Sequence, residues 1–182
     1  MRITVVGRGN VGGGLADLWE RAGHEVKRIG RDGGDVSEAE VVLLAVPGGA
    51  IAEALVKVEG IEGKTVIDAT NLYGVVPPDG FPSNAEFVKS KTNGPTAKSF
   101  NVNYASLYSR AGDGRARPGN LWCGDEEARE PVERLNRDAG YDAVYMGPIE
   151  NAAIQEGAVP VIFAIGTGMG PFFYRMAPPD QL

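Results

Sequence analysis

The sequence predicts an α/β fold with a doubly wound, mostly parallel sheet and a small helical extension at the C-terminus. Three observations predict it. Short β-branched runs alternate with stretches of helical spacing, a glycine-rich turn joins the first run to the first helix, and the run VVLLAV at residues 41–46 is apolar on both faces. Strands that alternate with helices form parallel sheets covered by helices, so their central strands are buried on both sides.

The first half of the chain contains four predicted strands. Their ranges are 2–7, 25–29, 41–46 and 64–70. A helix is predicted over 10–22 because Val11, Leu15, Leu18 and Trp19 follow three- and four-residue spacing, and Gly23 ends it. A second helix is predicted over 50–58, and 30–38 reads as a polar loop.

The second half continues the alternation after a loop rich in proline and glycine at 73–82. Strands are predicted at 97–101, 120–124 and 141–146, and helices at 84–91, 104–110 and 126–138. A long apolar helix follows over 149–169, with a kink at Pro160. We expect one Rossmann-like domain over 1–182, with a cofactor half at about 1–75 and an acceptor half at about 76–182.

Composition excludes several classes of protein. The 182 residues carry a net charge of −6, which argues against a general nucleic-acid-binding surface. Cys123 is the only cysteine, so we expect neither an internal disulfide nor a thiolate metal site. The longest apolar runs, 41–46 and 158–165, are shorter than the roughly 20 residues that cross a bilayer, and the N-terminus lacks signal-peptide features. We therefore expect a cytoplasmic protein that binds a small molecule, without a metal, nucleic acid or membrane partner.

The strongest local motif is a G-x-G-x-x-G turn between the first strand and the first helix. It consists of Gly7, Arg8, Gly9, Asn10, Val11 and Gly12. In a dinucleotide site the glycines permit the tight turn, the approach of a pyrophosphate and close packing of helix on strand. The uncompensated N–H groups at the helix start attract anions. We predict dinucleotide binding here, and the alternative is a glycine-rich turn without a ligand.

The end of the second strand predicts which dinucleotide binds. An acidic residue there favours NAD, whereas an arginine favours the 2′-phosphate of NADP. The chain has Gly30 and Arg31 at this place, with Asp32 only after the arginine. We predict NADPH over NADH. In the alternative interpretation, Arg31 pairs with Asp32 or Asp35 on a solvated loop.

Ligands of open α/β sheets lie beyond the carboxyl ends of the strands. Ala45, Val46 and Pro47 end the third strand, so we expect them to face the cofactor. Asn71 follows the fourth strand and is a candidate for polar contact with the nicotinamide side. The alternative for Val46-Pro47 is a stiff turn without a ligand.

Residues for acid–base catalysis are few. His24 precedes the second strand, away from the carboxyl ends, and none of the tyrosines has a lysine four residues later. Lys98 is a candidate general acid, although lysines more often bind phosphates or carboxylates or lie in solvent. These features favour hydride exchange between a nicotinamide and a second redox cofactor, a reaction in which the protein mainly binds and orients. No catalytic residue is assigned.

Several segments together resemble one known family. The segments are GRGNVGGGLA, GHEVKRIGRD, VVLLAVP, VIDATN, AKSFN, CGDEEA and YMGPIE, in this order along the chain. The sequence resembles the deazaflavin (coenzyme F420)-dependent NADP oxidoreductases, and also the cytosolic oxidoreductase domain of six-transmembrane ferric reductases. The resemblance implies hydride transfer between NADPH and a deazaflavin or flavin that stacks on the nicotinamide.

The resemblance also implies site residues. The family's Lys-Ala-Phe-Asn segment falls on Lys98, Ser99, Phe100 and Asn101, so Lys98, Phe100 and Asn101 join the expected cofactor site. Two other functions stay open. One is reduction of a small carbonyl or imine compound, with Tyr104, Tyr108 or Lys98 as the proton donor, and the other is a non-catalytic NADP(H) sensor. The apolar final helix is either core or a subunit interface, and we expect a homodimer.

Overall fold

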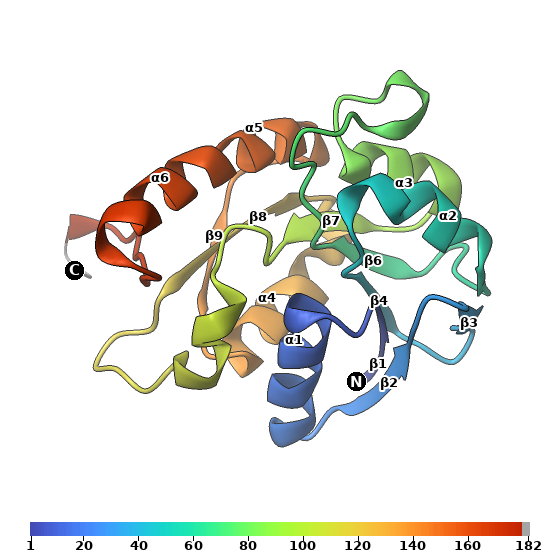
Figure 1. Cartoon of the computed structure of the whole chain (residues 1–182). Helices are drawn as coiled ribbons and strands as arrows, with labels where there is room; N and C mark the ends of the chain where they lie inside the picture. The colour runs from blue at the N-terminus through green and yellow to red at the C-terminus, as the bar shows by residue number, and fades with distance from the viewer. Residues whose placement is uncertain (180–182) are drawn as a thin grey trace.

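A computed structural model describes residues 1–179 of the chain. Seven strands form one sheet, in the order β2-β1-β4-β6-β7-β8-β9 (Figure 1). The strands are β1 (Arg2–Val6), β2 (Glu25–Ile29), β4 (Val41–Leu44), β6 (Thr65–Asp68), β7 (Thr96–Ser99), β8 (Gly119–Gly124) and β9 (Asp142–Tyr145). All neighbours pair in parallel except β7 and β8, which confirms the predicted mostly parallel sheet.

Helices cover both faces of this sheet. They are α1 (Asn10–Arg21), α2 (Ile51–Val56), α3 (Asn84–Thr92), α4 (Arg129–Asp138), α5 (Ala152–Gly157) and α6 (Val159–Met169). Ile3 and Val5 of β1 face α1 and α4, whereas Val6 faces α2 and α3. Because successive strand residues point to opposite faces, one apolar strand supplies two separate cores.

Short 3₁₀ helices join several of these elements. They are η1 (Gly48–Ala50), η2 (Pro78–Gly80), η3 (Ala105–Arg110), η4 (Glu126–Ala128) and η5 (Ile149–Asn151). The predicted helix over 104–110 is therefore present as the tighter η3. The loop predicted over 30–38 contains β3 (Gly34–Asp35), which pairs in parallel with β5 (Val58–Glu59) in a second, two-stranded sheet. Two-residue strands carry too little pattern to be predicted from sequence.

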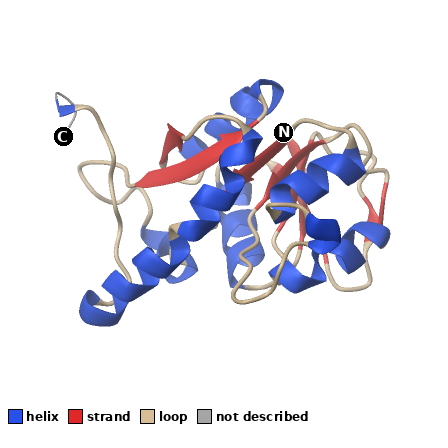
Figure 2. Ribbon diagram, turned by 90° about the horizontal axis from the view of Figure 1, so that it is seen from above, coloured by secondary structure: helices blue, strands red, loops and turns tan. Residues whose placement is uncertain are grey.

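The long apolar helix at the C-terminal end is confirmed, with its break just before Pro160. The segments η5, α5 and α6 follow one another from Ile149 to Met169, and α6 extends past the end of the sheet (Figures 1 and 2). By length and composition alone this helical run could cross a membrane, and only 22% of its most apolar stretch is buried. The expectation that no segment reaches that length is therefore wrong, because the prediction counted uninterrupted apolar runs rather than the helix that contains them.

Candidate functional site

The loop after β1 makes a turn that requires glycine. Gly7 has a φ of +110°, and a Cβ there would lie 2.2 Å from the carbonyl oxygen of Ala45. A Cβ on Gly12 would lie 2.1 Å from the carbonyl oxygen of Gly7. The Cβ position of Gly9, in contrast, has no atom of the described part of the chain within 4 Å. The turn therefore has a tightly packed inner side and an open outer side, where a ligand can approach the backbone.

Helix α1 begins at this turn and presents uncapped N–H groups. Gly9 precedes the helix in an extended conformation, no side chain of the described residues caps the helix, and its first turn contains no acidic residue. The first N–H groups of a helix lack intrahelical acceptors and lie at the positive end of the helix dipole. This end of α1 therefore suits the oxygens of a phosphate group.

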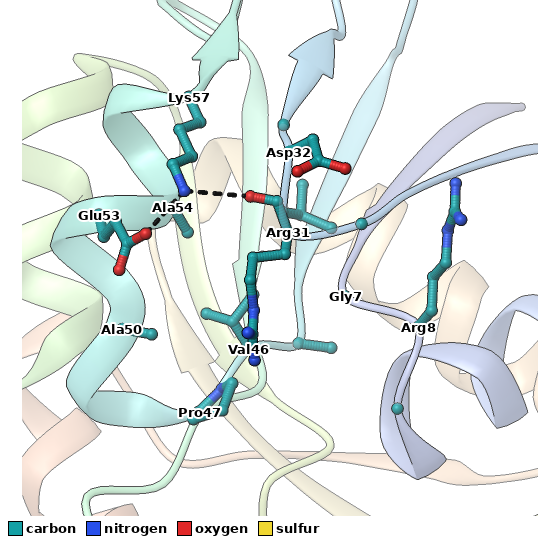
Figure 3. A pocket seen from close by; sticks show the side chains of 15 residues that line it. Gly7, Arg8, Arg31, Asp32, Val46, Pro47, Ala50, Glu53, Ala54 and Lys57 are labelled. Carbon is teal, nitrogen blue, oxygen red and sulfur yellow. Dashed lines mark hydrogen bonds and ion pairs between the residues drawn. The ribbon is translucent and has the colours of Figure 1, made fainter.

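A pocket of about 620 Å³ opens beside the turn, between the loop after β2 and helix α2 (Figure 3). We call it the first pocket. Its walls come from four segments that are distant in the sequence: residues 6–9, 30–33, 45–47 and 50–57. The carboxyl ends of β1, β2 and β4 meet here, as the parallel order of these strands requires.

Three cationic side chains line the first pocket. Arg31 extends across it toward Val46 and Pro47, Arg8 lies on the opposite wall, and Lys57 comes from the end of α2 (Figure 3). Lys57 Nζ lies 2.6 Å from Glu53 Oε1 and donates to the carbonyl oxygen of Arg31 at 3.3 Å. Arg8 donates to the carbonyl oxygen of Arg28 at 3.1 Å. No ion pair to Asp32 or Asp35 engages the Arg31 guanidinium among the described residues, so the solvated ion-pair interpretation has no support in the structure.

The two-stranded sheet fixes the loop that carries Arg31. Gly34 donates from its N–H to the carbonyl oxygen of Lys57 at 3.0 Å. Gly33 has a φ of +76°, and a Cβ there would lie 2.0 Å from that same oxygen. The main chain of the loop is thus held tightly against the end of α2, which keeps Arg31 and Lys57 on one wall of the pocket.

A second pocket, of about 250 Å³, continues from the first along the strand ends. The two share Ala45, Val46 and Pro47. The rest of its lining consists of Val11, Gly48, Gly49, residues 69–73 and Val75. Most of this lining is apolar, so the arrangement is a charged pocket that leads into an apolar one.

Three amide side chains connect the second pocket to α5. Asn71 Nδ2 donates to the carbonyl oxygen of Asn101 at 2.7 Å, and Asn101 Nδ2 donates back to Asn71 Oδ1 at 3.0 Å. Gln155 Nε2 then donates to Asn101 Oδ1 at 2.7 Å. Since both polar atoms of Asn71 are engaged within the protein, the network fixes its position at the pocket wall.

Lys98 does not reach either pocket. Its side chain is fully buried, with Nζ 2.8 Å from Asp68 Oδ2, 2.6 Å from Glu156 Oε1 and 2.7 Å from the carbonyl oxygen of Thr70. Burial alone would lower the pKa of Lys98, but the two carboxyl groups hold it above its usual value. Burial also raises the pKa of Glu156 against the opposing effect of Lys98. Lys98 is therefore held in the core by two carboxyl groups and is not presented to a ligand.

Phe100 is likewise a core residue. Its ring meets the Trp19 ring edge to face at 5.7 Å, and its side chain is fully buried. Asn10 lies apart from both pockets and lines another hollow with Arg8, Gly9 and Ser106. Gly12 contributes packing between α1 and the turn. The expected contacts of Lys98 and Phe100 with a cofactor therefore find no support in where their side chains lie.

The structure gathers most of the other predicted residues. The first pocket holds Gly7, Arg8, Gly9, Gly30, Arg31, Ala45, Val46 and Pro47, and the second adds Val11 and Asn71. Asn101 lies behind Asn71 as its hydrogen-bond partner. The sequence analysis did not identify Lys57. The four-residue spacing of Glu53 and Lys57 on a predicted helix could have indicated that the two side chains pair. The sequence analysis also missed Tyr73 and Gln155, for which the sequence contained no recognisable signal.

Neither protein-family models nor curated proteins give a match to the chain. Several solved structures, in contrast, match the chain. A proposed F420-dependent NADP reductase from Arthrobacter sp. FB24 superposes with a TM-score of 0.80 at 24% identity, over 98% of this chain and 100% of the other. The hypothetical protein SMa0349 from Sinorhizobium meliloti gives 0.68 at 21% identity, over 84% and 88%. A reductive aminase from Aspergillus terreus in complex with NADPH and ethyl levulinate gives 0.62 at 16% identity, over 92% of this chain and 60% of the other.

These similarities establish the architecture. The full-length agreement with the Arthrobacter protein covers the sheet, its flanking helices and the C-terminal helix. The chain therefore has a Rossmann-like fold, which it shares with these proteins.

Proposed function

We propose that the chain is an NADPH-dependent oxidoreductase that transfers a hydride between NADP(H) and a flavin or deazaflavin acceptor. The observation that carries the proposal is the continuity of the two pockets. A glycine turn with open backbone lies at one side of the first pocket, three cations line its walls, and an apolar pocket adjoins it at the strand ends. NADP(H) needs all three features: a glycine turn for its pyrophosphate, cations for its 2′-phosphate and an apolar site for its nicotinamide.

The residues present fit NADPH. The open outer side of Gly9 and the start of α1 would hold the pyrophosphate, and Arg31, with Arg8 and Lys57 nearby, would hold the 2′-phosphate. Guanidinium groups bind phosphate through paired, charge-assisted hydrogen bonds. Val46 and Pro47 would guide the nicotinamide toward the second pocket. Bound NADPH would supply a hydride at that pocket.

The acceptor assignment rests on the apolar character of the second pocket and on aromatic rings beside it. The Tyr73 and Phe163 rings lie 5.9 Å apart, and the Phe163 and Tyr104 rings 6.0 Å apart. Rings of this kind suit a planar acceptor. Hydride transfer to a flavin or deazaflavin requires binding and orientation more than a protein acid. The NADP reductase named for F420 and the NADPH-bound aminase support the nucleotide part of the proposal at the level of fold.

The test is to mix the purified protein with NADPH and, separately, FMN, FAD, a deazaflavin and a ferric chelate, and to follow loss of NADPH absorbance. We expect turnover with a ring acceptor and slower turnover with NADH. Tight NADPH binding without turnover by any acceptor would contradict the proposal and would support a non-catalytic sensor. The matched variant is Arg31→Ala, which should affect NADPH and spare NADH.

A homodimer that forms through α6 is the second part of the proposal. Val161, Ile165 and Met169 are exposed at four-residue spacing along one side of this helix, and an exposed apolar surface of this kind marks an interface. A membrane is the poorer partner, because Gln155 and Glu156 of the preceding α5 are held inside the protein. The eleven residues of α6 span roughly 17 Å, against about 30 Å for a bilayer core.

A further inference from the structure

Tyr73 lies at the lip of the second pocket in an uncommon backbone conformation. Its φ is +36°, the residue is 70% exposed, and it contributes to the pocket lining. A bulky residue with positive φ costs roughly 1–3 kcal/mol, and such strain concentrates at ligand sites. The ring contact with Phe163 of α6 holds the side chain at this position.

No acceptor within residues 1–179 takes the proton of the Tyr73 hydroxyl group. Asn71 Nδ2 donates to Tyr73 Oη at 3.3 Å, so the phenol oxygen acts as the acceptor in that hydrogen bond. A phenol carries one proton and further acceptor capacity, and accepting leaves the proton available. Asn71 is itself fixed by Asn101, so the donor that supports Tyr73 is held in place.

Other groups that sequence reasoning offers as proton donors are committed elsewhere. Lys98 is buried between two carboxyl groups. The Tyr104 hydroxyl donates to the carbonyl oxygen of Ile162 at 2.9 Å, and the buried Tyr108 hydroxyl donates to that of Phe100 at 3.4 Å. Of the described residues that line the second pocket, Tyr73 alone brings a phenol.

We infer that this pocket also reduces small compounds with a polarised C=O or C=N bond, and that Tyr73 is their proton donor. The inference rests on the nucleotide part of the proposed function. The substrate carbon takes hydride from NADPH as the π bond breaks, and the oxygen or nitrogen takes the proton from Tyr73 Oη. Asn71 stabilises the resulting tyrosinate, and water reprotonates it because the side chain is exposed. The products are an alcohol or amine and NADP⁺.

The experiment compares wild type, Tyr73→Phe and Tyr104→Phe with NADPH and two kinds of acceptor. The small substrates are cyclohexanone and the cyclic imine methylpyrroline, and the ring acceptor is whichever of FMN, FAD or the deazaflavin wild type reduces. A lost general acid costs about 100- to 10,000-fold in rate. We expect Tyr73→Phe to lose this much with the small substrates and at least about tenfold less with the ring acceptor, because phenylalanine keeps the aromatic ring and removes only the proton. Tyr104→Phe, which removes a hydroxyl whose proton is already donated to Ile162, should keep at least about ten times more of the small-substrate rate than Tyr73→Phe.

A second measurement needs no turnover. With the tyrosines labelled by ¹³C at Cζ, addition of a saturated cyclic amine and NADP⁺ should shift one resonance, and that resonance should be missing in Tyr73→Phe. Wild type that reduces ring acceptors but neither small substrate would overturn the inference and leave the proposed function intact. Equal rates for wild type and Tyr73→Phe would also overturn it. Failure to bind NADPH would overturn both.

Discussion

Lys98 Nζ and Asp68 Oδ2 lie 2.8 Å apart with both side chains fully buried, at the carboxyl ends of neighbouring strands β7 and β6. Glu156 approaches the same ammonium group from α5. One cation therefore joins two strands of the sheet to the C-terminal helical segment. Because α5 also carries Gln155, which supports Asn101 and Asn71, this ion cluster positions one wall of the second pocket.

Lys98→Met should strongly destabilise the fold. Removal of one partner from a buried ion pair leaves an uncompensated charge and typically costs about 3–5 kcal/mol. Urea denaturation should report this loss in the free energy of unfolding. Lys91→Met is the control, because Lys91 pairs with Asp79 on the surface and such pairs contribute about 0–1 kcal/mol. Equal effects of the two variants would show that the Lys98 cluster contributes no more than a surface pair.

Glu156→Gln should change how stability depends on pH. Burial raises the pKa of Glu156 above the value of 4.5 for a free glutamate, so between these two values the folded state binds more protons than the unfolded state. Stability from the protonated carboxyl is therefore present below about pH 4.5 and is lost as pH rises through the folded pKa. The glutamine variant lacks this loss. The free energy of unfolding of Glu156→Gln, relative to that of wild type, should therefore increase with pH above about 4.5. Parallel curves of unfolding free energy against pH for the two proteins would show that burial does not raise the pKa of Glu156.

Arg31→Ala should weaken NADPH binding selectively. Charged hydrogen bonds contribute about 1.5–3 kcal/mol, which corresponds to roughly 10- to 150-fold in the dissociation constant. NADH lacks the 2′-phosphate, so its dissociation constant should change by less than about threefold. Fluorescence titration of both nucleotides checks this, with Arg115→Ala, an exposed arginine in a distant loop, as the control. An unchanged NADPH constant would remove Arg31 from the site.

The order of strands and helices was predictable because apolar runs, glycines and helical spacing act locally. VVLLAV reads as a strand buried on both faces, and Val41–Leu44 is buried in the interior of the sheet, between β1 and β6. The glycine turn was predictable for the same reason, since its geometry depends on residues within one short segment. These features can be recognised from a short segment of sequence, without information on contacts between distant segments.

The remaining features depend on contacts between distant segments. Lys98, Asp68 and Glu156 come from two strands and a helix, and nothing local to any of them indicates that a lysine is buried. Strand β8 reverses direction next to β7 because the chain returns through η3 and the loop after it, and sequence spacing does not encode this reversal. Lys57 directly precedes β5, and the pairing of β5 with β3 brings it against the loop that carries Arg31.

Gly12→Ala and Gly9→Ala should separate folding from binding at the turn. A methyl group on Gly12 would meet the Gly7 carbonyl oxygen and Val5, and overpacking of this kind costs about 1–3 kcal/mol. A methyl group on Gly9 has open space, and the residue has a negative φ, so Gly9→Ala should keep wild-type stability. It should still weaken both NADPH and NADH, since the methyl group would occupy the path of the pyrophosphate. Thermal unfolding and nucleotide titration test the pair, and unchanged binding in Gly9→Ala would place the phosphates elsewhere.

The proposed homodimer can be tested through the apolar face of α6. Val161 and Ile165 are four residues apart, lie on one side of the helix and are both exposed, so two glutamates there would place like charges in the interface. Sedimentation equilibrium should show a dimer for wild type and a monomer for Val161→Glu with Ile165→Glu. Val56→Glu, which changes an exposed apolar residue on α2, should remain a dimer. A monomeric wild type would refute the proposal, and binding of wild type to lipid vesicles would instead identify α6 as a membrane-surface helix.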